Sequence, residues 1–234
     1  MKLRFLYKKD NEYYFLAEDF SPIQINTLRR LIIEEVPTMA IEEVYIRKHN
    51  SGLFNEQLAL RLGLIPLKTD LNYNFRDECT CKGVGCTFCE VRFKLKKKGP
   101  GWVYSKDLES SDPNVVPVFD NIPITWLEEW QEVDLEAKAI LGKGKEHSKW
   151  KVAHVYFFEL PEVKKDGKKL SEKEIIDLGL EKIETLKEKG ELEINYKKNS
   201  YILVIEPFGQ LDIKEILTTA IDELLKKVEK LKIE

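Results

Sequence analysis

The chain has 234 residues, of which 43% are hydrophobic and 10% aromatic, so it can bury a sizeable core and is not intrinsically disordered. Its 38 basic and 41 acidic residues leave a net charge of -3, which gives no long-range attraction for phosphate and argues against a nucleic-acid clamp. Residues 1–15 lack the apolar core of a secretory signal, and no apolar run reaches the length of about 18 residues that a membrane span needs. We therefore expect a cytoplasmic protein that does not enter the membrane.

The first elements predicted are a β-hairpin and a helix. Alternating apolar and polar residues predict strands over 2–8 and 13–17. Ser21 and Gln24 form an S-x-x-Q capping box that begins a helix, and Pro37 ends it because proline disfavours helical backbone in the preceding residue. The apolar side chains that share one face of this helix are Ile25, Leu28, Leu31 and Ile32.

The middle of the chain has mainly the pattern of β-structure. A short helix is predicted over 54–62, where apolar residues recur every four positions. The proline-containing stretch 109–125 is incompatible with a regular helix and is expected to be extended. Strands are predicted at 44–46, 91–95, 133–141 and 152–160.

Residues 162–190 change in composition to Lys and Glu interspersed with Leu and Ile. Ser171 and Glu174 form a second capping box, and Gly190 is expected to end the helix that follows. A pair of strands is then predicted at 191–196 and 201–207, about a turn at 198–200.

The C-terminal helix carries the strongest periodic pattern in the sequence. Its apolar residues follow a spacing of three and four over almost nineteen residues: Ile213, Ile216, Leu217, Ala220, Ile221, Leu224, Leu225, Val228 and Leu231. Such a stripe packs either on the protein's own sheet or on another chain. Because it is wider than one sheet face requires, the pattern favours a partner chain.

All four cysteines lie close together in the order C-x-C-x4-C-x2-C: Cys79, Cys81, Cys86 and Cys89. Clustered thiols in an intracellular chain are more often a metal site than disulfides. A tetrahedral zinc site is favoured over reduced structural thiols and over an iron–sulfur cluster, and four thiolates leave no open position, so a zinc ion here is expected to be structural.

No catalytic residues are predicted. The segment Gly142 to His147 contains Gly-x-Gly but lacks the full phosphate-loop pattern, so it is expected to be a turn after the preceding strand. The three histidines are far apart, and no D-x-D-x-D cluster is present for two-metal nucleotidyl transfer.

Several segments, in order along the chain, resemble the α-like assembly subunits of multisubunit DNA-directed RNA polymerases. Leu60–Leu67 (LRLGLIPL) is similar to the H-R-L-G-L-I-P-L segment of the archaeal and eukaryotic branch, with leucine in place of the usual histidine. By length the chain resembles the archaeal members of this family more than the longer eukaryotic ones. The other matching segments are Asn26–Arg30, Val36–Ile41, Val103–Leu108, Gly144–Trp150 and Gly209–Leu211.

This resemblance implies an α+β fold with a discontinuous dimerisation domain, residues 1–47 and 151–234, and an inserted, mainly β domain at 48–150 that carries the cysteine loop. It implies a non-catalytic scaffold that pairs with the small subunit L and then contacts the large catalytic subunits and the small subunits N and P. The implied interface with subunit L consists of Ile25, Leu28, Leu31, Ile32, Ile216, Leu217, Ala220, Ile221, Leu224, Leu225 and Val228.

The sequence also departs from the family pattern. The eukaryotic zinc loop, C-x-C-x3-C-x2-C, is one residue shorter than the loop here. Some archaeal relatives carry an iron–sulfur insertion, but no cysteine follows Cys89, so no iron–sulfur cluster is expected. The chain ends soon after its last helix, so direct sequence-specific DNA contact is not expected either. The alternatives are a free-standing structural-zinc or redox protein and a promoter-reading α homodimer.

Overall fold

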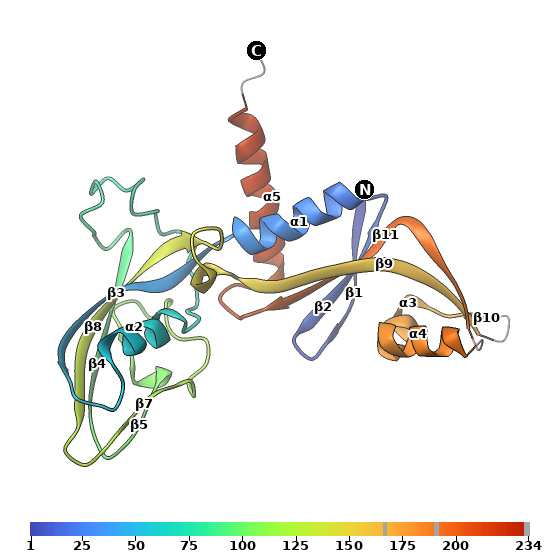
Figure 1. Cartoon of the computed structure of the whole chain (residues 1–234). Helices are drawn as coiled ribbons and strands as arrows, with labels where there is room; N and C mark the ends of the chain where they lie inside the picture. The colour runs from blue at the N-terminus through green and yellow to red at the C-terminus, as the bar shows by residue number, and fades with distance from the viewer. Residues whose placement is uncertain (166–167, 190–191, 232–234) are drawn as a thin grey trace. The chain divides into compact units, whose positions relative to one another are not determined.

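The computed structural model describes residues 1–165, 168–189 and 192–231, and these separate into two compact units (Figure 1). The first unit consists of Met1–Arg30 and His154–Glu206, and the second of Leu31–Ala153 and Pro207–Glu234. Each unit therefore combines segments that are distant in the sequence. No described helix is long and apolar enough to cross a membrane.

The first unit is built on a five-stranded sheet. Its hairpin is antiparallel, with Phe5 opposite Phe15, as the alternation over 2–17 predicts. In spatial order the strands are β1 (Lys2–Lys9), β2 (Glu12–Glu18), β11 (Glu193–Pro207), β9 (Ala153–Lys165) and β10 (Lys168–Lys169).

The prediction of two strands, at 191–196 and 201–207, is wrong, because β11 is a single strand from Glu193 to Pro207. The polar residues expected to form a turn remain within it, and Asn199 takes a left-handed φ of 54° as a local irregularity. Residues Ser200 to Ile205 pair with β2 across the sheet. Tertiary pairing therefore overrides the local turn preference. Gly190, which is expected to end the helix after Ser171, and Glu191, the first residue of the predicted strand 191–196, lie outside the described part of the chain.

Three helices accompany this sheet: α1 (Pro22–Glu34), whose last residues belong to the second unit, α3 (Glu172–Leu178) and α4 (Leu180–Glu188). The capping boxes at Ser21 and Ser171 both form, as predicted. The single helix predicted after Ser171 is two helices, because Gly179 has a φ of 79° that breaks the helical backbone. Ile176 of α3 packs with Leu16 and Leu160 of the sheet.

The second unit contains a four-stranded sheet and a two-stranded one. In spatial order the larger sheet has β3 (Pro37–His49), β8 (Glu132–Lys143), β4 (Glu90–Lys98) and β6 (Glu109–Ser110), and the smaller has β5 (Gly101–Tyr104) and β7 (Pro123–Leu127). The helical elements are α2 (Asn55–Gly63), η1 (Ser105–Asp107), η2 (Ser148–Trp150) and α5 (Ile213–Glu229).

The core of the second unit lies against one face of β8. The alternation predicted over 133–141 is confirmed, since every second side chain from Val133 to Leu141 is buried. Leu58 and Leu62 of α2 and Phe93 of β4 are fully buried in the same cluster. The observed elements confirm the α+β class with a mainly β insertion.

Candidate functional site

The four cysteines converge as a group of thiols between β3 and β4 in the sequence. Their Sγ atoms all lie within 4.8 Å of one another. The Sγ–Sγ distances are 3.6 Å for Cys79 and Cys86, 3.6 Å for Cys81 and Cys89, and 3.8 Å for Cys86 and Cys89. Thiolates about 2.3 Å from a tetrahedral zinc ion are about 3.8 Å apart, so the spacing of this group can hold a metal ion of that size.

Glycines and local hydrogen bonds fold the loop so that the thiols meet. Gly83 and Gly85 have φ values of 81° and 97°, a backbone conformation that residues with side chains rarely adopt. The amide of Cys89 donates to the carbonyl of Cys86 (3.0 Å), and the amide of Cys86 donates to the thiol of Cys89 (3.3 Å). The final C-x-x-C therefore forms a tight turn with both sulfurs on one side.

The thiols differ in how readily they lose a proton. A hydrogen bond from the Gly85 backbone lowers the pKa of Cys81 to about 7. Burial raises the pKa of Cys89 to about 12. Because metals bind thiolates, a cation bound here would have to displace the proton of Cys89, whereas Cys81 loses its proton more readily.

Arg76 connects the cysteine loop to the sheet. Its Nε donates to the carbonyl of Gly83 (3.1 Å), and its Nη1 donates to Glu43 of β3 (2.5 Å). Glu43 also accepts a hydrogen bond from the Tyr45 hydroxyl (2.7 Å) and lies 3.4 Å from Lys138. The hydrogen bond from Arg76 is the main reason that the pKa of Glu43 is lowered to about 2. No sequence pattern indicates this connection, since its members are far apart in the chain.

Glu90 lies directly beneath the loop. Its side chain is almost fully buried and accepts hydrogen bonds from Arg92 at 3.2 and 3.0 Å. Gly85 lies so close to this carboxylate that a Cβ would overlap it. Glycine at position 85 is therefore favoured by the backbone conformation, and a side chain there would also have to displace the buried Glu90 carboxylate.

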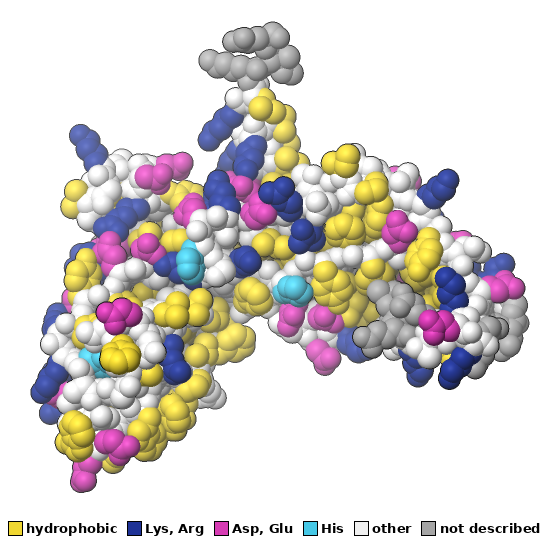
Figure 2. Space-filling model, viewed as in Figure 1, with side chains coloured by type: hydrophobic (Ala, Val, Ile, Leu, Met, Phe, Trp, Pro, Cys, Tyr) yellow, Lys and Arg dark blue, Asp and Glu magenta, His cyan; other side chains and the backbone are white. Residues whose placement is uncertain are grey.

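The C-terminal helix α5 has two distinct faces. Asp212 caps it by accepting from the amides of Lys214 (2.8 Å) and Glu215 (2.9 Å), and the D-x-x-E pattern of these residues is a sequence signal for the helix start that the predictions missed. The buried face consists of Ile216, Ala220 and Glu223. The exposed apolar face consists of Ile221, Leu224, Leu225 and Val228, whose exposed fractions are 47%, 36%, 54% and 54%. Figure 2 shows hydrophobic side chains along one side of α5 and basic ones along another.

The predicted interface residues therefore differ in exposure. Those already buried within the chain are Ile25, Leu31, Ile32, Ile216 and Ala220, and those partly buried are Leu28 and Leu217. The four residues of the exposed apolar face are available to another chain. The interface with a partner stays a prediction, now centred on that face.

The segment after β8 is a turn, as predicted, and not a phosphate loop. Strand β8 ends at Lys143, and the amide of Glu146 donates to the Lys143 carbonyl (2.9 Å). Trp150 is buried against Gly142, so close packing explains why glycine occupies the first position of the Gly-x-Gly pattern.

Comparison with known proteins identifies the class of this chain. Residues 44–155 match the RNA polymerase Rpb3/RpoA insert domain. DNA-directed RNA polymerase subunit Rpo3 of Methanosphaera stadtmanae is 37% identical, over 98% of this chain and 96% of its own length. The Rpo3 subunits of Thermoplasma volcanium and Archaeoglobus fulgidus are 34% and 33% identical, over 97% and 98% of this chain and 96% of each relative.

The chain is thus similar over nearly its whole length to subunits of a multisubunit RNA polymerase. It belongs to the archaeal Rpo3 family, and the resemblance found in the sequence is confirmed.

Proposed function

We propose that this chain is a non-catalytic assembly subunit of a DNA-directed RNA polymerase that pairs with a small subunit L. The observation that carries the proposal is the exposed apolar face of α5. Ile221, Leu224, Leu225 and Val228 form a continuous stripe on a helix whose other face is already buried. Burying a fully exposed side chain of this kind contributes roughly 1.5–3 kcal/mol, and these four, already about half buried, would each contribute part of that amount when a complementary chain covers the face.

In the proposed assembly, the dimerisation domain, residues 1–47 and 151–234, binds subunit L. The inserted domain, residues 48–150, and the surfaces around it contact the large catalytic subunits and the small subunits N and P. Pairing with subunit L comes first because it buries the apolar face that is otherwise exposed to water. The chain makes no sequence-specific DNA contact in this proposal.

The cysteine group is proposed to hold one structural zinc ion. Three pairs of Sγ atoms lie 3.6–3.8 Å apart and all four lie within 4.8 Å of one another, which supports a tetrahedral zinc site. Zinc bound there would link the two ends of the loop and leave no coordination position for a substrate. An iron–sulfur cluster is not proposed, because the described spacing already fits a single ion.

Native mass spectrometry of the purified chain with subunit L tests the pairing and the metal together. The expected species is a 1:1 complex with the added mass of one zinc ion. A chain that remains monomeric with subunit L present, or that pairs only with itself as a promoter-reading α homodimer would, contradicts the proposal.

The alternative of a free-standing structural-zinc or redox protein is not favoured. The relatives similar over nearly the full length are polymerase subunits, and their similarity extends through α5 as well as the cysteine loop. In a free-standing protein the exposed apolar face would lower solubility without contributing to the binding of a partner.

A further inference from the structure

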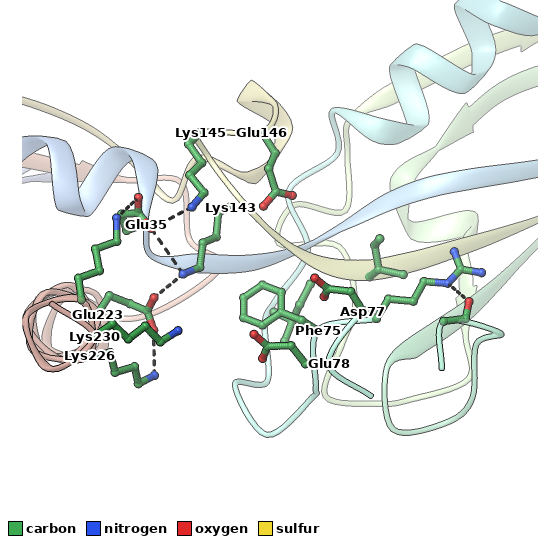
Figure 3. A pocket seen from close by; sticks show the side chains of 15 residues that line it. Glu35, Phe75, Asp77, Glu78, Lys143, Lys145, Glu146, Glu223, Lys226 and Lys230 are labelled. Carbon is green, nitrogen blue, oxygen red and sulfur yellow. Dashed lines mark hydrogen bonds and ion pairs between the residues drawn. The ribbon is translucent and has the colours of Figure 1, made fainter. Parts of the chain in front are cut away.

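Three buried or nearly buried charged residues meet where α5 packs on the rest of the second unit. Lys143, at the end of β8, lies between Glu35 and Glu223 (Figure 3). Its Nζ is 3.5 Å from Glu35 and hydrogen-bonds to Glu223 of α5. Only 14% of the Lys143 side chain, 8% of Glu35 and 10% of Glu223 are exposed. We call Glu35, Lys143 and Glu223 the ion triad.

Three further lysines surround the ion triad from its solvent side. Lys227 of α5 donates to Glu35 at 2.5 Å, and Lys145 lies 3.5 Å from the same carboxylate. Lys226 donates to Glu223 at 2.8 Å. The two carboxylates are therefore each contacted by more than one cation, and they border a cavity of about 850 Å³.

The ion triad lies beyond the last apolar contact that α5 makes with the rest of its unit. The buried positions of α5 are Ile216, Ala220 and Glu223, so the third inward position is charged instead of apolar. The next position on this face is Lys227, which also makes an ion pair. The outer half of α5 is consequently held to its own unit by charge pairs.

If α5 were held to its unit by hydrophobic contacts alone, nothing would favour leaving its largest apolar face exposed to water. The exposed face of α5 is centred about a third of a turn away from the buried face, at 100° per residue. The hydrophobic effect is non-directional, so by itself it does not distinguish the observed rotation from one that buries Leu224 or Leu225 in place of Ile216 or Ala220. Such a rotation would pull Glu223 away from Lys143 and leave buried charges unpaired, which is strongly unfavourable.

We propose that Glu223 is a positioning residue for subunit pairing: through Lys143 and Glu35 it sets the rotation of α5 and so keeps the apolar face directed outward for the partner. This inference rests on the proposed pairing with subunit L. Buried ion pairs often add little net stability but fix one arrangement among several apolar ones. The expected signature is a loss of partner affinity without a matching loss of stability.

The test compares binding to subunit L with thermal unfolding for a set of variants of the full chain. Glu223→Leu and Glu223→Gln remove the charge that holds α5. We expect both variants to remain folded with a Tm modestly below that of the native chain, since the carboxylate contributes some stability, but to bind subunit L at least about tenfold more weakly. Lys143→Arg keeps the cation and is expected to retain binding. The matched control is Asp222→Asn, which removes an exposed charge from the neighbouring position of α5 and is expected to change neither quantity.

The outcomes separate this inference from the proposed function. A native chain that does not bind subunit L overturns the proposed function and this inference with it. A native chain that binds, together with Glu223→Leu and Glu223→Gln variants that bind equally well, overturns only the positioning role. An affinity loss fully matched by a lower Tm overturns it as well, since it shows that Glu223 contributes only stability. Slower hydrogen exchange on the exposed face in the free Glu223→Leu chain would support inward rotation.

Discussion

Gly142 lies against the indole of Trp150 so closely that a Cβ at position 142 would overlap the ring. The Trp150 side chain is buried, its Nε1 donates to the Ile140 carbonyl at 3.3 Å, and its own carbonyl accepts from the Thr38 hydroxyl at 2.9 Å. The indole is thus buried and hydrogen-bonded, so a larger residue at position 142 would have to displace it. The glycine pattern that superficially resembles a phosphate loop is explained here by close packing.

Replacing Gly142 with alanine is therefore expected to destabilise the chain. Overpacking of this kind costs about 1–3 kcal/mol, and the fixed indole leaves little room for relaxation. Urea unfolding of Gly142→Ala measures the free energy of unfolding directly. Gly52→Ala is the matched control, since no atom lies within 4 Å of a Cβ built there, and its stability is expected to stay near that of the native chain.

A charge on the exposed face of α5 is expected to abolish pairing while the chain still folds. Ile221 and Leu224 are 47% and 36% exposed in the free chain, so Ile221→Glu and Leu224→Asp do not disturb its core. In a complex with subunit L they would bury an unpaired charge, which costs several kcal/mol. Co-purification with subunit L measures the loss. Leu60→Asp, at a 57% exposed position of α2, serves as the control, and undiminished recovery of subunit L with Leu224→Asp would contradict the assigned face.

Loss of Arg76 is expected to weaken metal retention by the cysteine loop. Arg76 holds the loop carbonyl of Gly83 and pairs with Glu43, so Arg76→Ala frees the loop from the sheet. Groups that orient metal ligands typically contribute about 10–100-fold in affinity. The rate at which a colourimetric chelator removes zinc measures the effect. Arg47→Ala removes an exposed ion pair from the same strand as Glu43 and should release zinc at the native rate.

The subunit L complex is expected to survive removal of the metal. The exposed face of α5 contains no cysteine and is formed by residues distant in the sequence from the loop. Chelator treatment should therefore increase hydrogen exchange over residues 77–90 and leave the 1:1 stoichiometry unchanged, with the mass lowered by one zinc ion. Dissociation of the pair on chelation would show that the loop supports the interface.

Acid is expected to weaken the packing of α5. Burial raises the pKa values of Glu35 and Glu223, but hydrogen bonds and charges from the flanking lysines outweigh it and hold both below the usual value of 4.5. A carboxylate whose pKa is lower in the folded chain binds fewer protons when folded, so acid favours unfolding. The stability that such a carboxylate contributes to the folded chain is fully present above about pH 5 and is lost as the pH falls through about 4.5 and below. Tm measured against pH should fall less steeply for Glu223→Gln than for the native chain.

Elements with strong local signals could be predicted from the sequence. The capping boxes at Ser21 and Ser171 and the alternation of β8 are set by neighbouring residues, and each forms as predicted. The prediction was wrong around Asn199, where turn-forming residues remain within β11, whose residues from Ser200 to Ile205 pair with β2. The break at Gly179 depends on a single positive φ that periodicity does not show.

The cysteine group, the family resemblance and the apolar stripe on the last helix are encoded by residues close together in the chain, so they could be predicted without the fold. Which part of that stripe is covered depends instead on contacts between distant segments. Glu35, Lys143 and Glu223 come from three distant segments and meet at one buried point, and on the same helix as Glu223 Ile216 is buried and Leu224 is exposed. Burying charge requires partners at contact distance, and no local pattern specifies them.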